Sequence, residues 1–226
     1  MSDKTIILST KTLSPIQKEE LVKANIEVLE ADFIKTENAS FEIKNLNKNL
    51  IFTSQNAVLS ILQHPTIEEL KNKTVFCVGS KTKELLNENG FTVEAYTGYA
   101  EDLAEIITLV YSDESFTFFS GNLRRDTLPE ILTENEITFN EIKVYDTTLT
   151  PHKISDKVDG ILFFSPSAVT SYLKKNTLAN EKLFCIGNTT AAALQQELTE
   201  NKIKNIKIAF QPTVENVIDQ VIEFYN

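Results

Sequence analysis

The sequence is poor in the residue types on which much protein chemistry depends. Its 226 residues include only two cysteines and six glycines. Cys77 and Cys185 are too few for a disulfide scaffold and lack the spacing of a metal site. The turns at Gly79 and Gly187 match neither the phosphate loop nor the Gly-x-Gly-x-x-Gly dinucleotide fingerprint. We therefore expect no nucleotide cofactor, no metal and no disulfide.

The sequence also has few histidines, no excess of basic over acidic residues and no long apolar run. His64 and His152 each lie beside a proline in a polar connection, where we expect surface residues rather than members of a hydrolytic triad. The 22 Lys and Arg residues are outnumbered by 32 Asp and Glu, and the resulting net charge of −10 argues against a nucleic-acid partner. The run Ile6-Ile7-Leu8 is too short for a signal sequence or a membrane span. We expect a cytoplasmic protein without membrane contact.

The most informative feature that is present is an internal duplication. Residues 50–63, LIFTSQNAVLSILQ, match residues 161–174, ILFFSPSAVTSYLK, at an offset of 111. Residues 75–86, VFCVGSKTKELL, match residues 183–194, LFCIGNTTAAAL, at an offset of 108. Because both offsets are close to half of the 226 residues, the repeat predicts two domains rather than one large domain.

Each half alternates short apolar runs with helical patterns. Such alternation is typical of an α/β protein, in which helices cover a parallel sheet. The stripe from Val214 through Val217, Ile218 and Val221 predicts a final amphipathic helix. The two cysteines lie within apolar runs, so we expect both to be buried in strands.

Four small polar turns follow apolar runs and precede helices. They are residues 53–56, 79–82, 165–167 and 187–190. In open α/β sheets, ligands bind beyond the carboxyl ends of the strands, where helix N-termini present amides suited to carboxylate or phosphate. Ser, Thr and Asn are also the preferred N-caps, so any one of these turns is more simply a structural cap. Their duplicated positions favour an anion-binding role for the set.

Two further features have both a structural and a functional interpretation. Arg124 and Arg125, the only arginines, form either a solvated loop or a carboxylate clamp. Strict strand alternation places Tyr145 on the face opposite Ile142 and Val144. Its hydroxyl is then available to a cleft, although packing of a rim tyrosine against a loop is the simpler alternative.

Taken in their order along the chain, these segments resemble the uroporphyrinogen-III synthase family. The motifs that carry the resemblance are Phe52-Thr53-Ser54-Gln55-Asn56-Ala57-Val58, Val78-Gly79-Ser80-Lys81-Thr82, Arg125 with Leu128, Val144-Tyr145-Asp146-Thr147, Phe164-Ser165-Pro166-Ser167-Ala168-Val169, Ile186-Gly187-Asn188-Thr189-Thr190-Ala191 and Pro212-Thr213. Enzymes of this family close hydroxymethylbilane, a linear tetrapyrrole, into uroporphyrinogen III with inversion of ring D and loss of water.

The resemblance implies a fold of two similar flavodoxin-like parallel-sheet domains joined by a two-stranded linker. Domain 1 is then discontinuous, residues 1–34 plus 149–226, domain 2 is residues 36–144, and the linkers lie at about 30–36 and 144–149. It further implies a monomeric, cofactor-free lyase of heme biosynthesis that holds its substrate between the domains.

The resemblance also implies roles for individual residues. Tyr145 is expected to help the hydroxyl group leave. The residues expected to bind substrate are Thr53, Ser54, Gly79, Ser80, Thr82, Arg125, Ser165, Ser167, Gly187, Thr189 and Thr190. The alternative is a non-catalytic two-domain binder or sensor of an anionic small molecule, which would use the same turns. A phosphosugar- or nucleotide-using enzyme is disfavoured because the phosphate loop is missing.

Overall fold

The computed structural model describes residues 4–198 and 203–226, and the chain divides into two compact units. Unit 1 combines both ends of the chain, residues 1–35 and 148–226, whereas unit 2 is the continuous segment Thr36–Thr147. The chain passes from one unit to the other within β3 (Ile34–Asn38) and again within β8 (Thr138–Leu149). These two strands are hydrogen-bonded neighbours.

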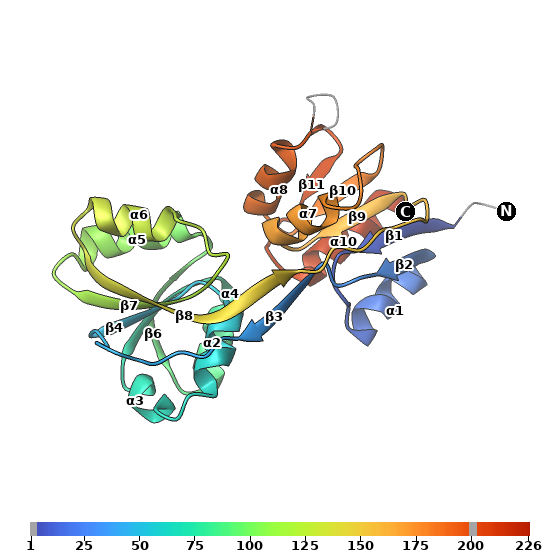
Figure 1. Cartoon of the computed structure of the whole chain (residues 1–226). Helices are drawn as coiled ribbons and strands as arrows, with labels where there is room; N and C mark the ends of the chain where they lie inside the picture. The colour runs from blue at the N-terminus through green and yellow to red at the C-terminus, as the bar shows by residue number, and fades with distance from the viewer. Residues whose placement is uncertain (1–3, 199–202) are drawn as a thin grey trace. The chain divides into compact units, whose positions relative to one another are not determined.

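Unit 1 is a three-layer structure around a five-stranded sheet of order β11-β10-β9-β1-β2 (Figure 1). The neighbouring strands run parallel. Helices α7 and α8 pack on one face of the sheet, and α1 and α10 pack on the other. The elements are β1 (Thr5–Ser9), α1 (Pro15–Lys23), β2 (Ile26–Glu30), β9 (Gly160–Phe163), α7 (Pro166–Leu173), β10 (Lys182–Cys185), α8 (Asn188–Gln195), β11 (Ile206–Ile208) and α10 (Val214–Tyr225).

Unit 2 repeats this plan around a six-stranded sheet of order β3-β8-β7-β4-β5-β6. Helices α2 and α4 cover one face, and α5 and α6 cover the other, as Figure 1 also shows. Besides β3 and β8, the elements are β4 (Asn49–Phe52), α2 (Gln55–Leu62), α3 (Ile67–Lys71), β5 (Thr74–Val78), α4 (Ser80–Glu88), β6 (Thr92–Thr97), α5 (Ala100–Val110), β7 (Ser115–Gly121) and α6 (Thr127–Glu134).

The two sheets share one topology. In unit 1 the strands, numbered by their order in the chain, lie side by side as 2-1-3-4-5, which is the flavodoxin-like order. In unit 2, β7 and β8 take the places of β1 and β2, while β4, β5 and β6 take those of β9, β10 and β11. Unit 2 is therefore a circular permutation of unit 1 with β3 added at its edge. The predicted α/β class with parallel sheets is confirmed.

The duplication seen in the sequence is confirmed at single residues. Ser54 is the N-cap of α2 and Ser165 the N-cap of α7, its counterpart in the other unit. Cys77 and Cys185 are both fully buried, each under the matching pair of helices. Burial raises the pKa of the Cys77 thiol to about 11 and that of Cys185 to about 12, so both remain protonated packing groups at neutral pH.

Candidate active site

The four polar turns lie at the carboxyl edges of the sheets, two in each unit. Ser54 and Ser165 act first as helix caps. The Ser54 hydroxyl accepts a hydrogen bond from the Asn56 amide at 3.1 Å, and the Ser165 hydroxyl accepts one from the Ala168 amide at 3.1 Å. Ser167 lies 3.0 Å from Ser165, hydroxyl to hydroxyl. Both serines therefore cap their helices, as the structural interpretation predicts, and the anion-binding role of the two turns stays a prediction. Thr53 lies half-buried immediately before the first of them.

The other two turns begin with glycine and offer a different surface. Gly79 is the N-cap of α4 and Gly187 the N-cap of α8, and neither glycine has a side chain with which to cap its helix. Gly79 has a φ of 90°, a left-handed backbone that an L-residue rarely adopts. A helix that begins without a side-chain acceptor directs the positive end of its dipole at an incoming anion.

The hydroxyl residues of these glycine turns differ in accessibility. Ser80 is exposed and Thr189 is half-buried, whereas Thr82 and Thr190 are 4% and 1% exposed. The Thr190 hydroxyl oxygen is buried without a hydrogen-bond partner among the described residues. A buried hydroxyl without a partner costs free energy, so a ligand group that reached it would be bound favourably.

The two arginines of the loop after β7 have separate environments. Arg124 makes a two-pronged contact with Glu141, from Nε to Oε1 at 2.7 Å and from Nη2 to Oε2 at 2.8 Å. Burial raises the pKa of Glu141, but hydrogen bonds from Arg124 and Ser120 outweigh it and hold the pKa below its usual range. The Arg124 guanidinium is thus bound to Glu141 of β8, whereas Arg125 is exposed.

Lysines distinguish the start of α4 from the start of α8. Lys81 and Lys83 lie in the first turn of α4, and Lys83 places its ammonium 3.9 Å from the centre of the Tyr96 ring. At the duplicated positions α8 carries Thr189 and Ala191. Only the α4 turn therefore adds full positive charges to its amide donors.

Tyr145 does not lie where strand alternation predicts. Ser120 pairs with Lys143 and Gly121 pairs with Tyr145, so Val144 is an extra residue in β8, a β-bulge. The bulge brings Tyr145 onto the same face as Ile142 and Val144, against the apolar cluster beneath α2 and α4. The prediction of opposite faces was wrong because it assumed that side chains alternate between the two faces without interruption. The extra residue in β8 breaks that alternation.

Tyr145 nevertheless lies at the carboxyl edge, close to a predicted turn. Gly121 is the last residue of β7, and the ring of Tyr145 covers it. In the adjacent strand Phe52 pairs with Phe119, which places the Ser54 turn level with Gly121. Tyr145 is half-buried, and no hydrogen bond engages its hydroxyl within the part of the chain that the structure describes.

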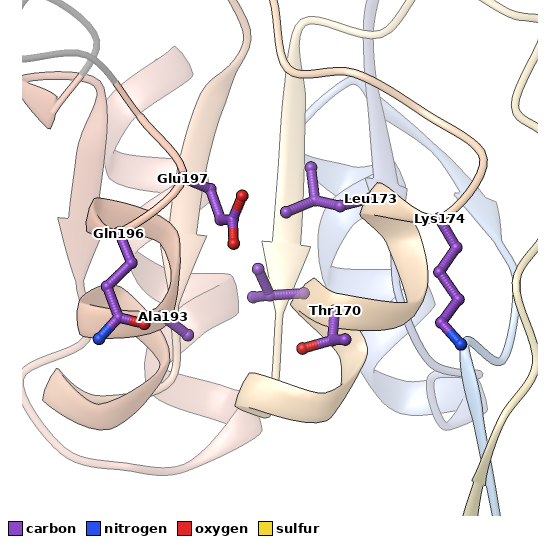
Figure 2. A pocket seen from close by; sticks show the side chains of 7 residues that line it. Thr170, Leu173, Lys174, Ala193, Gln196 and Glu197 are labelled. Carbon is purple, nitrogen blue, oxygen red and sulfur yellow. The ribbon is translucent and has the colours of Figure 1, made fainter.

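A pocket of about 280 Å³ lies elsewhere, on the surface of unit 1 (Figure 2). Side chains from α7 and α8 face it, chiefly from the C-terminal ends of these helices. The residues that line it are Val169, Thr170, Leu173, Lys174, Ala193, Gln196 and Glu197. The polar turns at Ser165 and Gly187 are at the opposite helix ends, so this pocket is not part of the candidate site.

The described residues contain neither a metal-binding cluster nor a membrane-spanning helix. No group of three or more His, Cys, Asp and Glu residues among them is arranged to hold a metal ion. No helix in residues 4–198 and 203–226 is long and apolar enough to cross a membrane.

Comparison with known proteins identifies a family. The family model for uroporphyrinogen-III synthase HemD matches residues 17–219. Uroporphyrinogen-III synthase of Chlorobaculum parvum is 28% identical over 182 residues, which cover 70% of this chain and 74% of that protein. The porphyrin biosynthesis protein HemD of Ruminiclostridium josui is 28% identical over 172 residues, 68% of this chain and 32% of that longer protein.

Solved structures share the fold over nearly the whole chain. Uroporphyrinogen-III synthetase from Helicobacter pylori superposes with a TM-score of 0.70 at 23% identity, covering 98% of this chain and 99% of that one. A mutant uroporphyrinogen III synthase from Thermus thermophilus gives a TM-score of 0.67 at 15% identity, covering 97% of each chain. With the family model matching most of the chain, this protein belongs to the uroporphyrinogen-III synthase family.

Proposed function

We propose that the protein cyclises hydroxymethylbilane to uroporphyrinogen III, with inversion of ring D and loss of one water, in tetrapyrrole and heme biosynthesis. The observation that carries this proposal is the family match over residues 17–219. The geometry of Tyr145 supports it, because a phenol with no hydrogen bond to another described residue lies at the edge where α/β sheets bind ligands.

Substrate binding must overcome an unfavourable charge. The substrate carries eight carboxylates and the protein has a net charge of −10, so long-range attraction is absent. Helix N-termini bind anions without adding net charge, and each unit contributes two such turns. We assign the carboxylates to the turns at Thr53 and Ser54, at Gly79, Ser80 and Thr82, at Ser165 and Ser167, and at Gly187, Thr189 and Thr190, with Arg125 and Lys81 adding charged contacts.

In the chemical step Tyr145 acts as the proton donor. The electron-rich terminal pyrrole expels its hydroxyl group, which takes the phenol proton and leaves as water. The substituted carbon of ring D then attacks the resulting cation to give a spiro intermediate. The older bond from that carbon to the methylene bridge of ring C breaks, and the methylene cation so formed bonds to the unsubstituted carbon of ring D, which closes the inverted ring. Loss of a proton restores the pyrroles and returns the phenol to its neutral form. One positioned acid contributes about 10²–10⁴-fold.

Orientation of the flexible tetrapyrrole is the larger task. Without an enzyme the terminal cation is attacked by the unsubstituted carbon, which gives the type I isomer. Holding ring D in the less accessible orientation lowers the activation free energy by removing an entropic cost. In well-oriented reactions this effect reaches about 7–11 kcal/mol. We propose that the two units serve as the two domains of a monomeric, cytoplasmic enzyme that needs neither a cofactor nor nucleic acid.

The isomer composition of the product tests this function. The protein is incubated with freshly prepared hydroxymethylbilane, and the oxidised porphyrins are separated by isomer, with heat-denatured protein as the control. We expect type III in clear excess over the type I formed spontaneously. Type I alone would instead favour the non-catalytic binder of an anionic small molecule.

A further inference from the structure

The ring of Tyr145 rests on a residue that has no side chain. A Cβ atom built on Gly121 would lie 2.3 Å from both Cε2 and Cζ of Tyr145 and 2.8 Å from its hydroxyl oxygen. Real Cβ atoms do not approach other atoms this closely, and the crowded atoms include the one that carries the proton. The phenol end of the ring thus occupies the volume of the missing side chain. Any residue other than glycine at position 121 displaces it.

The backbone of β8 is shaped to bring the ring there. The bulge at Val144 aligns Tyr145 with Gly121, while the fully buried Val144 side chain remains in the core. On the other side of β8, toward β3, the Val144 carbonyl accepts a hydrogen bond from the Ala39 amide at 3.0 Å. The irregular backbone is therefore also anchored to the segment that directly follows β3.

Asn122 secures the segment that follows. Its side chain accepts a hydrogen bond from the Thr147 amide at 2.7 Å and donates one to the Thr147 carbonyl at 3.1 Å. Its backbone amide donates to the Tyr145 carbonyl at 3.3 Å. Three bonds from one exposed residue thus fix residues 145–147 to the end of β7.

We propose that Gly121 is a positioning residue for the cyclisation: together with the Val144 bulge and Asn122, it sets the direction in which the Tyr145 hydroxyl points. This inference rests on the proposed function. Gly121 supplies space for the ring of Tyr145 and has no reacting group of its own. It therefore affects kcat only by setting the position of the Tyr145 hydroxyl. A misplacement of about 1 Å in a reacting group can cost about 10²-fold in rate.

A double-mutant cycle tests the proposal in the full-length protein. Turnover of freshly prepared hydroxymethylbilane to the type III isomer is measured for wild type, Gly121→Ala, Tyr145→Phe and the double variant, with circular dichroism to monitor folding. Gly121→Ala should lower kcat about 10²-fold with less than about a threefold change in KM. In the Tyr145→Phe background the same substitution should lower kcat less than about twofold, because the hydroxyl is already missing. Gly98→Ala, whose added Cβ meets no atom within 4 Å, is the matched control and should retain wild-type kcat.

The outcomes separate the two proposals. If wild type yields only the type I isomer, the proposed function falls, and the positioning role falls with it. If wild type is active, the positioning role is overturned either by a Gly121→Ala variant with wild-type kcat or by equal losses in both backgrounds. Should Gly121→Ala fail to fold, Asn122→Ala decides through the same cycle: a drop in kcat of severalfold that disappears with Tyr145→Phe supports the proposal, and an unchanged kcat overturns it.

Discussion

Two tyrosines of this protein rest on glycines, one in each unit. Tyr145 covers Gly121 in unit 2, and a Cβ built on Gly160 of unit 1 would lie 2.9 Å from the hydroxyl of Tyr225. The two glycines occupy opposite ends of their strands. Gly121 ends β7 and Gly160 begins β9, so the first lies at the carboxyl edge of its sheet and the second at the amino edge.

The edges give the two phenols different properties. The Tyr225 hydroxyl is buried and has no hydrogen-bond partner among the described residues. Burial, with a smaller effect of the Asp159 charge, raises the pKa of Tyr225 to about 12, so it stays neutral and serves packing. Tyr145 is half-buried at the edge where ligands bind to α/β sheets. The same glycine–tyrosine contact therefore supports stability at one edge and, by our proposal, catalysis at the other.

Removing each hydroxyl is the strongest test of this comparison. Tyr145→Phe should lower kcat for type III formation about 10²-fold, the contribution of one positioned acid. Tyr225→Phe should leave kcat unchanged and should not lower the free energy of unfolding, because the deleted hydroxyl makes no hydrogen bond. Steady-state turnover and urea denaturation measure the two effects. Tyr111→Phe, which removes an exposed hydrogen bond to Glu94, is the control for loss of a phenol in unit 2. Equal losses of kcat at positions 145 and 225 would contradict the distinction.

Substitution of the second glycine, Gly160, should lower the free energy of unfolding without changing kcat. The Cβ of Gly160→Ala would also lie 3.2 Å from Cε2 of the buried Phe184, so the core must shift. Such overpacking costs about 1–3 kcal/mol. We expect the midpoint of urea denaturation to fall while kcat per folded molecule stays at the wild-type value. A clear loss of kcat in folded Gly160→Ala would show that the amino edge also affects the reaction.

Local sequence patterns predicted the duplicated parts of the two units well. Ser54 and Ser165 are predicted caps that the structure confirms, because capping depends on residues within one turn of the helix. The stripe of α10 is confirmed as well, with Val217, Ile218 and Val221 fully buried. Both features depend on residues close together in the sequence, so they can be predicted without knowledge of the tertiary structure.

The features that distinguish the two units could not be predicted in this way. The bulge at Val144 exists only in relation to its partner strand β7, and alternation within β8 therefore assigned Tyr145 to the wrong face. Glu141 forms the two-pronged contact with the Arg124 guanidinium but lies 17 residues away along the chain, so no local pattern predicts the pair. The Gly121 contact and the bonds of Asn122 likewise join separate strands. The sequence points to the candidate catalytic residue only through the family resemblance, and it does not predict the geometry that orients this residue.

The helix caps offer a smaller comparison between the units. Ser165→Ala should remove the bond to the Ala168 amide, and Ser54→Ala the bond to the Asn56 amide. Each loss should destabilise the protein by about 1 kcal/mol. Because each serine is one of many proposed donors to the substrate, KM should rise only about threefold in either variant. Thermal denaturation and steady-state kinetics measure both effects, and a tenfold or larger rise for one serine alone would show that the units share the carboxylates unequally.

The smallest expected effect concerns the ion pair that accompanies Tyr145 on β8. Because Glu141 has a pKa below its usual range in the folded protein, its contribution to stability is present above the unfolded value of about 4.3 and is lost as the pH falls through the lower folded value. At pH 7, Glu141→Gln should therefore be less stable than wild type by at most about 1 kcal/mol, since the pair is partly exposed and screened by water.

The pH dependence of that difference separates charge from packing. Urea denaturation at a series of pH values should show the gap between wild type and Glu141→Gln closing below about pH 4, whereas the control Glu88→Gln, on the exposed surface of α4, should show no such gap. A gap that persisted in acid would mean that Glu141 stabilises β8 through shape rather than charge. If kcat at pH 7 also fell in Glu141→Gln and the fall disappeared in the Tyr145→Phe background, the ion pair would join Gly121 in orienting the phenol. The regular β1–β2 pair of unit 1 contains neither a bulge nor this arginine–glutamate contact, so such a result would identify both as specialisations of unit 2.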